Sequence, residues 1–572
     1  MVAAISLRRD IGAAQGGIGV GAGSFVDVVR GHAERFPERV THCWLDGDCR
    51  VTGSLTFGDV DLQARRIAVA LQRFAAPGDR ILLALPPGLS IVVGFMGALY
   101  AGCVAVPLPP ANGLRGRERR VAVRDDARPA AILAVSPKDV ADLCVRDRPP
   151  VPVLMLGDLE PGMEDSWRAP STHGDTIAFL QYTSGSTGSP KGVMVSHGNL
   201  TANIGMITAA FGTDSATRLV SWLPPHHDMG LIGGVLGPLM VNCHAALMDP
   251  LVFIQRPLRW LTALSSQRAT TTGGPSFAYG LCAAEIARRG LPEADLSHLR
   301  IAYCGAEPIQ VAALRDFASA CAPLGFDPTA WTPCYGMSES TLMITSVAAG
   351  EGLRTAPRSG GAPSVDCGTA WGEGVAIVVD PSTRAPRPDG VEGEIWTSGP
   401  HVAQGYLGRE DETGRTFGAR TEPDDGRRYL RTGDLGVLVS GRLHITGRLK
   451  NLIILHGRKH CPEDIETTIL SGSGLPVSAA AAFAVSDGGP ESLILMLETT
   501  MHSAPEAERR QLELAARRSV SAGHGLVASS VHLLRPGMIP RTGNGKLRRE
   551  RFAALHEDIM RHEIAASAEQ DR

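Results

Sequence analysis

Residues 177–192 read Ile177-Ala-Phe-Leu-Gln-Tyr-Thr-Ser-Gly-Ser-Thr-Gly-Ser-Pro-Lys-Gly192, an apolar run followed at once by small hydroxyl residues and glycines. Such a loop lets backbone N–H groups and side-chain hydroxyls approach phosphate oxygens closely, and Lys191 adds a point charge. It is not a Walker A loop, because Gly-Lys-Ser/Thr is missing. A flexible Gly/Ser linker is the other interpretation, but a linker rarely lies between a buried strand and a helical run, which we expect here. The segment therefore predicts a phosphate-binding loop.

Short apolar runs alternate with helical stretches on both sides of this loop, from about residue 25 to the 430s. This alternation is typical of an α/β protein, in which ligands bind at strand ends. The uncharged stretch 81–114 is divided by prolines, so we expect a strand (Ile81–Leu85), a helix (Leu89–Ala101) and a second strand (Cys103–Val106) rather than a membrane span. Other strand-like runs are Ala131–Ala134, Thr176–Tyr182, Leu219–Leu223 and Leu299–Cys304.

The character of the chain changes twice further on. Pro- and Gly-rich turns surround strands such as Val375–Val379 and Gly393–Thr397, and a compact segment of strands and helices follows Arg448. At this length we expect more than one domain. The predicted organisation is a flexible segment at 1–24, a large α/β domain of parallel-rich sheets with a β-rich subdomain at 25–447, a small mobile α+β domain at 448–556, and a tail at 557–572.

Composition excludes several classes of protein. The chain has 572 residues with 56 Lys+Arg and 59 Asp+Glu, and this near-neutral charge argues against a nucleic-acid binder. Eleven cysteines without a CxxC pair indicate buried thiols in a reducing compartment, rather than a disulfide framework or a zinc site. The segment Met1–Asp10 lacks the apolar core of a signal peptide. We therefore expect a soluble, cytoplasmic protein with no nucleic-acid partner and no membrane span.

The loop and six later segments resemble the adenylate-forming (acyl-activating) enzyme superfamily, most of all the fatty acyl-AMP ligases, over roughly residues 25–556. The resemblance implies that ATP and Mg²⁺ are used to convert a fatty or related carboxylic acid into an acyl-AMP with release of pyrophosphate. The later segments, in the order of the family, are Trp222-Leu-Pro-Pro-His-His-Asp-Met-Gly230, Cys304-Gly-Ala-Glu307, Cys334-Tyr-Gly-Met-Ser-Glu339, Tyr429-Leu-Arg-Thr-Gly-Asp434, Gly447-Arg-Leu-Lys450 and Pro540-Arg-Thr-Gly-Asn-Gly-Lys546.

The resemblance also assigns the nucleotide contacts. Glu339 is a hard oxygen ligand suited to Mg²⁺ that bridges ATP phosphates, although a lone glutamate is more often an exposed helix cap. Tyr335 offers a flat face to adenine, and Asp434 can accept bonds from both ribose hydroxyls, although packing and a turn are the ordinary roles of such residues. The implied nucleotide-binding residues are Thr183, Ser184, Ser186, Thr187, Lys191, Gly305, Ala306, Glu307, Tyr335, Gly336, Met337, Ser338, Asp434, Arg448 and Lys450.

Three residues are the catalytic candidates: Lys546, His227 and Glu339, which is also the metal ligand. Two anions must approach during adenylation, so a cation that bridges carboxylate and phosphate, as implied for Lys546, would position them and stabilise charge. His226 and His227 lack the spacing of a zinc helix, and the resemblance places them at the carboxylate end of the pocket. Which of the two contacts substrate stays open. The resemblance places the interdomain hinge at Lys450.

The acyl acceptor is the least determined part. The resemblance implies the phosphopantetheine thiol of an acyl carrier protein, with a medium- or long-chain acyl-CoA synthetase as the alternative. The stretch 341–366 looks shorter than the insertion that fatty acyl-AMP ligases carry there, so the choice stays open. The apolar segment 247–260 suits either an alkyl tunnel or plain core. The basic run from Arg541 to Arg551 could face an acidic carrier protein or only solvent.

Two other classes are weighed, a silent binding module and a P-loop NTPase. The presence of Lys191, Glu339, Asp434 and Lys546 argues against the first, and the missing Walker pattern argues against the second. The chain has only five lysines, and four of them fall in the segments above or next to them. Lys191, Lys450 and Lys546 lie in these segments, and Lys459 lies shortly after the hinge segment. Lys138 is the lysine without an explanation.

Overall fold

The computed structural model describes residues 23–144, 150–184, 190–357, 363–455, 458–472, 475–485, 491–541 and 547–570. Lys546, Ser186 and Thr187 therefore lie outside the described residues, as does the side chain of Ser184.

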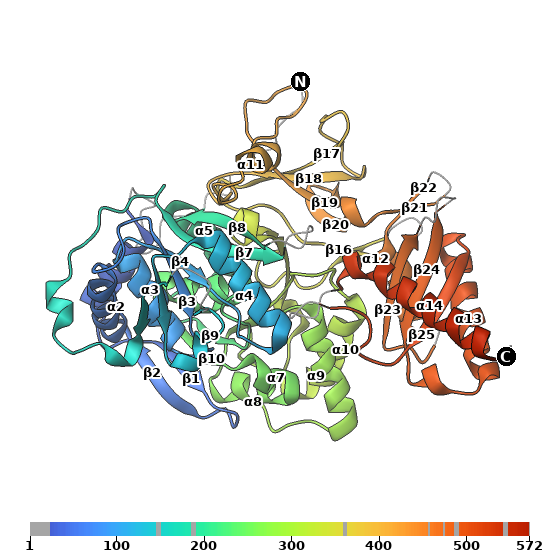
Figure 1. Ribbon diagram of the computed structural model, residues 1–572, viewed down its shortest axis with the longest axis horizontal. Coiled ribbons are helices and arrows are strands. Elements are labelled where there is room, and N and C mark those ends of the chain that lie inside the picture. Colours follow the sequence, from blue (N-terminus) through green and yellow to red (C-terminus); the bar gives the residue numbers. More distant parts are fainter. Residues whose placement is uncertain are drawn as a thin grey trace.

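Two parallel-rich sheets form the large part of the molecule, as the sequence predicts (Figure 1). In the eight-stranded sheet every neighbouring pair is parallel except the two outermost, and in the six-stranded sheet only the last pair is antiparallel. The first runs β14 (Met343–Ser346), β13 (Trp331–Gly336), β12 (Ile301–Cys304), β11 (Thr271–Gly274), β9 (Arg218–Ser221), β10 (His244–Met248), β1 (Val40–Leu45), β2 (Val51–Thr56), and the second runs β6 (Val153–Met155), β5 (Ala131–Ala134), β3 (Arg80–Ala84), β4 (Val104–Pro107), β7 (Ile177–Ser184), β8 (Pro190–Ser196).

Helices cover these sheets and fill the space between them. The uncharged stretch 81–114 is core, because α3 buries every residue from Ile91 to Tyr100. Helix α5 begins after Ser196, whose hydroxyl accepts a hydrogen bond from the backbone of Asn199. The helices of this part are α1 (Phe25–Arg35), α2 (Phe57–Leu71), α3 (Ser90–Tyr100), α4 (Gly113–Ala127), α5 (His197–Phe211), the π-helix η4 (Met229–Leu236), α6 (Gly237–Val241), α7 (Pro250–Gln255), α8 (Leu258–Ser266), α9 (Ser276–Arg289) and α10 (Val311–Cys321).

The remaining sheets are smaller. An antiparallel sheet joins β17 (Val375–Val379), β18 (Gly393–Ser398), β19 (Leu430–Val439) and β20 (Arg442–Arg448), with α11 (Glu410–Phe417) beside it (Figure 1). A three-stranded sheet of β23 (Ala479–Val485), β24 (Ser492–Glu498) and β25 (Ala528–Leu534) lies at the C-terminal end. Its helices are α12 (Pro462–Gly472), α13 (Glu506–His524) and α14 (Phe552–Gln570), and two short pairs are β15 (Thr355–Ala356) with β16 (Ser364–Val365) and β21 (Ile453–Leu455) with β22 (Arg458–His460).

One local expectation is wrong. The loop after β7 leads into a strand, β8, and not into a helical run, and helix α5 begins only at His197. The segment that follows Gly192 buries Val193 and Val195 fully on one side, and this alternation with branched side chains suits a strand paired with β7. The two strands on either side of the predicted phosphate-binding loop thus pair with each other, and Thr183 faces Lys191.

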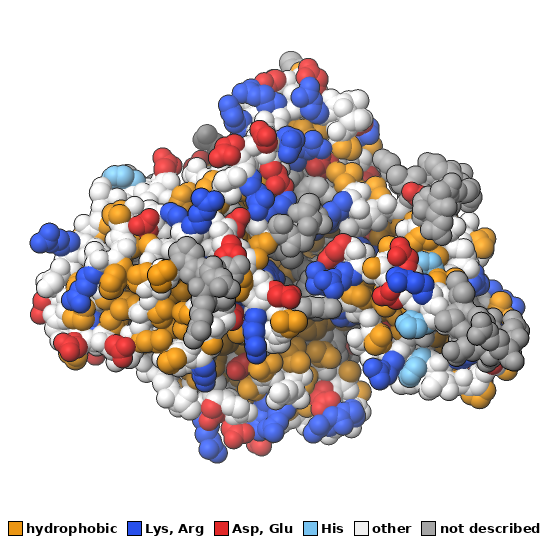
Figure 2. Space-filling view, viewed as in Figure 1, with side chains coloured by type: hydrophobic (Ala, Val, Ile, Leu, Met, Phe, Trp, Pro, Cys, Tyr) orange, Lys and Arg blue, Asp and Glu red, His pale blue; other side chains and the backbone are white. Residues whose placement is uncertain are grey.

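Composition agrees with the structure where it can be compared. All eleven cysteines are free and most are buried, as predicted. Acidic and basic side chains are interspersed over the face shown in Figure 2, in line with the near-neutral charge. Among the described helices none is long and apolar enough to span a membrane.

Five histidines are held neutral by the fold. Burial lowers the pKa of His42 to about 3 and the pKa values of His197, His244, His401 and His532 to about 4. In the unfolded chain each imidazole takes up a proton near pH 6.5. Between about pH 6.5 and pH 4 the unfolded state therefore binds more protons than the folded state, and stability rises with pH in this window.

We predict that the protein loses stability on mild acidification. Each of the five imidazoles should contribute a loss on the order of 1 kcal/mol between pH 7 and pH 5.5. The melting temperature measured across this range checks the prediction, and replacing His42 by glutamine should flatten the slope. A melting temperature that stays constant from pH 7 to pH 5 would contradict it.

Candidate active site

A cavity of about 1330 Å³ lies where the large sheets, the β17–β20 sheet and the C-terminal sheet meet. It brings together residues that are far apart in the sequence, from Thr183 to Arg549. Gly305 and His227 are not among its lining residues. The predicted site residues that line it are Thr183, Lys191, Ala306, Glu307, Tyr335, Gly336, Met337, Ser338, Glu339, Asp434, Arg448 and Lys450.

Asp434 is at the centre of one constellation in this cavity. The Tyr335 hydroxyl donates to Oδ2 of Asp434 at 2.8 Å, and Nε of Arg448 donates to Oδ1 at 2.6 Å. The β19–β20 register places Asp434 directly opposite Arg448, and the carboxylate raises the pKa of Arg448. A carboxylate offers about four lone-pair sites, so Asp434 can still accept hydrogen bonds from a ligand's hydroxyl groups.

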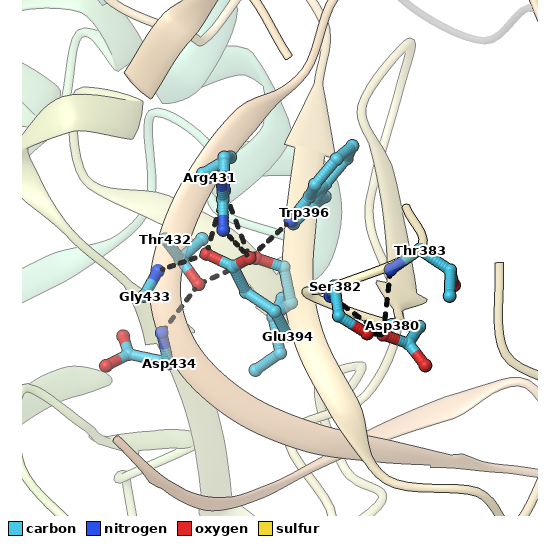
Figure 3. Close-up of polar contacts among 10 residues, drawn as sticks. Asp380, Ser382, Thr383, Glu394, Trp396, Arg431, Thr432, Gly433 and Asp434 are labelled. Carbon is cyan, nitrogen blue, oxygen red and sulfur yellow. Dashed lines mark hydrogen bonds and ion pairs between the residues drawn. The ribbon is translucent and has the colours of Figure 1, made fainter. Parts of the chain in front are cut away.

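Glu394, which the sequence reasoning missed, supports the chain at Asp434 (Figure 3). The residue is 2% exposed, and its Oε1 accepts the backbone N–H of Gly433 at 3.2 Å. Its Oε2 accepts Nε1 of Trp396 at 2.9 Å and Nη2 of Arg431 at 2.8 Å. Glu394 thus joins β18 to β19 immediately before Asp434. In the sequence its only signal is the Gly-Glu pair at the start of β18.

Replacing Glu394 by glutamine should raise the KM for ATP about 10-fold and change kcat less, because the charged partner of Arg431 and Gly433 is lost next to Asp434. Initial rates at varied ATP concentration test this. Asp380→Asn is the matched control, since Asp380 also accepts backbone hydrogen bonds from Ser382 (2.8 Å) but lies outside the cavity lining (Figure 3). Equal KM values for both variants would contradict the assignment.

Glu339 belongs to a second constellation. The hydroxyl of Tyr406 donates to its Oε1 at 2.8 Å, and burial raises the pKa of the Glu339 carboxyl. Lys191 lies 5.4 Å from the centre of the Tyr406 ring and forms an ion pair with Glu412 of α11. The loop lysine and the predicted metal ligand are thus joined through Tyr406. Neither Tyr406 nor Glu412 could be predicted from the sequence, because the first is a lone tyrosine and the second a lone glutamate in a helix.

The backbone around the predicted adenine segment is crowded. A Cβ on Gly305 would lie 2.7 Å from the carbonyl oxygen of Cys334, and Ala306 has a φ of +69°, which is rare for a residue with a side chain. Glu307 is partly engaged elsewhere, because its Oε1 accepts Oγ of Ser276 at 2.7 Å and the N–H of Phe277 at 3.0 Å at the start of α9.

The two histidines do not line the cavity, but they directly precede Asp228 and Met229, which do. Their rings are 4.3 Å apart, and burial lowers the pKa of His226 well below its ordinary value. The next residue, Asp228, lines the cavity and accepts the hydroxyl of Ser338 at 2.6 Å. Asp228 is a further residue that the sequence reasoning missed.

Part of the cavity lining is mostly apolar, and we call this set of residues the apolar arm. Its lining comes from helices α5, η4 and α6 and from the ends of β9 and β12, and not from the segment 247–260. The aromatic side chains of that segment belong to the core, because Phe253 stacks on Trp222 with ring centres 4.0 Å apart and Trp260 is fully buried, whereas Leu251 and Ile254 are exposed. The tunnel assignment for 247–260 is therefore wrong. Its residues are Ile204, Ile207, Phe211, Leu219, Met229, Ile232, Gly233, Pro238, Val241 and Tyr303, and the threonines Thr208, Thr213, Thr217 and Thr271 line the cavity as well.

Arg549, in the basic run near the C-terminus, is half-buried and lines the cavity. Nη1 and Nη2 of Arg549 donate to the two carboxylate oxygens of Glu466 at 2.7 Å and 2.8 Å, and Glu463 lies 3.2 Å away. Arg549 is therefore not a free charge on an exposed face, and both interpretations of the basic run stay predictions for its other members. The pair instead fastens the segment after residue 546 to α12.

Comparisons with known proteins now give the class. The family model described as "AMP-binding enzyme" matches residues 29–407, so the chain belongs to this family of adenylate-forming enzymes. Within it the chain is similar to fatty acyl-AMP ligases. It is 34% identical to the medium-chain-fatty-acid–[acyl-carrier-protein] ligase JamA of Moorena producens (92% of this chain, 94% of the relative) and 36% identical to the long-chain-fatty-acid–AMP ligase FadD26 of Mycobacterium marinum (92% and 96%).

Solved structures agree. A structure from a study of fatty acyl-adenylate ligases of Escherichia coli and Legionella pneumophila superposes with a TM-score of 0.82 at 30% identity, covering 95% of this chain and 98% of the other. The Legionella pneumophila fatty acyl-adenylate ligase in complex with acyl adenylate and pyrophosphate gives 0.72 at 34% identity, covering 93% and 96%. The predicted family and fold class are confirmed.

Proposed function

We propose that the protein is a fatty acyl-AMP ligase that activates a fatty acid with ATP and passes the acyl group to an acyl carrier protein. The observation that carries this proposal is the set of residues that line the large cavity. Part of the lining is polar and holds the Tyr335–Asp434–Arg448 constellation. Another part, the apolar arm, includes residues of α5 and η4. A nucleotide and an alkyl chain therefore have adjoining places.

The proposed reaction has two steps. A carboxylate oxygen of the fatty acid attacks the α-phosphorus of ATP, which forms the acyl–phosphate bond and expels pyrophosphate. A thiolate then attacks the acyl carbonyl, which forms a thioester and releases AMP. We assign contact with the ribose to Asp434, contact with phosphate to Lys191, and the charge that bridges carboxylate and phosphate in the first step to Lys546.

Glu339 fits the role of a Mg²⁺ ligand. It is a carboxylate at the cavity wall, and Mg²⁺ with ATP takes one or two protein carboxylates and completes its shell with phosphate oxygens and water. Among the described residues no group of three or more His, Cys, Asp or Glu could hold a metal alone, so phosphate oxygens would have to complete the site. When bound, Mg²⁺ supplies neutralisation of phosphate charge, and Tyr406 orients the Glu339 carboxylate that would hold it.

The phosphopantetheine thiol of a carrier protein is the proposed acceptor. Support comes from relatives whose names state this acceptor, such as the JamA ligase and the ligase TtuA of Teredinibacter turnerae, which is 32% identical over 91% of both chains. The alternative is free CoA, as in an acyl-CoA synthetase. The short stretch 341–366, which raised this alternative, includes the strand β14 and the pair β15–β16.

Incubation with ATP, Mg²⁺ and a series of fatty acids tests the proposal. Pyrophosphate should be released and acyl-AMP detected by mass spectrometry. Addition of a phosphopantetheinylated carrier protein should then discharge the acyl-AMP as a thioester, whereas free CoA should not. Absence of pyrophosphate release with any fatty, aryl or amino acid would contradict the first step, and discharge by CoA alone would support the alternative acceptor.

A further inference from the structure

Two residues outside the phosphate-binding segment hold its lysine, Lys191, in place. The Lys191 side chain lines the cavity and is 13% exposed. Its ammonium forms an ion pair with Glu412, in the first turn of α11, and lies 5.4 Å from the centre of the Tyr406 ring. A lysine side chain is flexible, and both a carboxylate and an aromatic face attract its charge. The ammonium therefore has a preferred place before any ligand binds.

Tyr406 is placed by pairing with the strand that carries Lys191. A β-bridge joins Tyr406 to Val193 of β8, and the backbone N–H of Leu407 donates to the carbonyl oxygen of Gly192 at 2.9 Å. Gly192 directly follows Lys191 in the chain. Backbone hydrogen bonds therefore set the tyrosine beside the lysine.

Glu412 is tied to the same place through α11. The Thr413 hydroxyl accepts the backbone N–H of Tyr406 at 3.0 Å. A Cβ on Gly405, whose φ is +128°, would lie 2.3 Å from Cγ2 of Thr413, so this close approach requires a glycine. Glu412 and Tyr406 thus reach Lys191 from one connected segment.

The ion pair leaves donors of Lys191 available to a ligand. An ammonium group carries several N–H donors, and Glu412 Oε1 accepts one of them. Glu412 itself does not line the cavity, whereas Arg415 and Thr416 later in α11 do. An effect of Glu412 on a bound phosphate therefore has to pass through another residue, and Lys191 is the residue it contacts.

A purely structural ion pair is the alternative explanation. The Glu412 side chain is 32% exposed, and ion pairs with this much exposure contribute little to the stability of a fold. Fixing a flexible cation before a ligand binds has a larger consequence, because the ligand then does not have to order that side chain. The exposure of Glu412 favours a role in binding over a role in folding.

We propose that Glu412 is a positioning residue for ATP: it holds the Lys191 ammonium so that its remaining donors can bind a phosphate group. This inference rests on the proposed function, in which Lys191 contacts phosphate. Loss of Glu412 should weaken the binding of ATP, and it should do so only when Lys191 is present.

The test is calorimetric titration with ATP and Mg²⁺ in the absence of fatty acid, which measures binding without turnover. Glu412→Ala should raise the Kd for ATP about 5-fold, and Glu412→Gln, which keeps an acceptor oxygen, should raise it less. Glu410→Ala is the matched control, since Glu410 is exposed in the same turn of α11 and does not line the cavity. Its Kd should equal that of the wild-type protein.

A double-mutant cycle shows whether Glu412 acts through Lys191. Lys191→Ala should raise the Kd for ATP about 10-fold, and adding Glu412→Ala to this variant should change the Kd by less than about 2-fold. Effects of the two substitutions that multiply would overturn the inference, since Glu412 would then act without Lys191. An unchanged Kd for Glu412→Ala would also overturn it, and so would a lower one, which would mean that Glu412 competes with phosphate for Lys191.

Two results separate this inference from the proposed function. An unchanged Kd for Lys191→Ala would overturn the phosphate contact assigned to Lys191, and the inference with it. A protein that binds ATP with the expected coupling and activates no acid would contradict the proposed function and support the role of Glu412.

Discussion

Replacing Lys546 by alanine is expected to lower the rate of acyl-adenylate formation by about 100- to 1000-fold, the largest effect of any single substitution proposed here. Two anions meet in this step, and a fixed cation that bridges them lowers the barrier by stabilising charge that develops in the transition state. The measurement is single-turnover formation of acyl-AMP. Substitution by arginine should rescue little, because a planar guanidinium presents its donors differently from a compact ammonium.

Lys138→Ala is the matched control for this variant. Lys138 is exposed in a short 3-10 helix (Pro137–Asp139) and does not line the cavity. Its loss should leave the adenylation rate unchanged. Adenylation by the Lys546 variant within about 3-fold of wild type would exclude the proposed role, since one lost transition-state contact of this kind costs far more.

Replacing Asp434 by alanine is expected to lower kcat/KM for ATP about 100-fold. The change removes the proposed ribose acceptor and leaves the Arg448 guanidinium and the Tyr335 hydroxyl without their shared partner. Removing Asp434 from this half-buried ion pair leaves the Arg448 charge uncompensated, so the melting temperature should fall as well. Steady-state rates at varied ATP concentration and thermal unfolding measure the two effects separately.

Asp366→Ala separates nucleotide binding from stability. Asp366 is 2% exposed and accepts Nε of Arg442 at 2.6 Å, so it resembles Asp434 in its pairing with an arginine of β20. It does not line the cavity. This variant should lose stability and keep its KM for ATP. If both variants changed the KM for ATP equally, Asp434 would have only a structural role.

The sequence predicted the buried strands well because their hydrophobic signal is local. Ala131–Ala134 and Val375–Val379 are strands with the expected bounds, and the uncharged stretch 81–114 is the expected strand, helix and strand. The segment after Gly192 was misjudged, since a short run of branched residues suits either element until its pairing partner is known. Tertiary pairing with β7 decided it.

Candidate site residues could likewise be predicted where their signal is local, and were missed where it depends on tertiary contacts. Tyr335, Asp434 and Arg448 lie in recognisable segments, and the structure brings them within hydrogen-bonding distance. Tyr406 and Glu394 were missed because each acts through a partner far away in the sequence. The apolar arm could not be located for a similar reason. Leu, Met and Phe in 247–260 look the same in a tunnel and in a core, and only packing distinguishes the two.

Transfer of an oxygen label tests the central claim most directly. Fatty acid labelled with ¹⁸O in its carboxylate is incubated with the protein, ATP, Mg²⁺ and a phosphopantetheinylated carrier protein, and the released nucleotide is analysed by mass spectrometry. Attack of the carboxylate on the α-phosphorus predicts AMP that contains one ¹⁸O atom, together with unlabelled pyrophosphate. Unlabelled AMP, or ADP with labelled phosphate, would contradict an acyl-AMP intermediate.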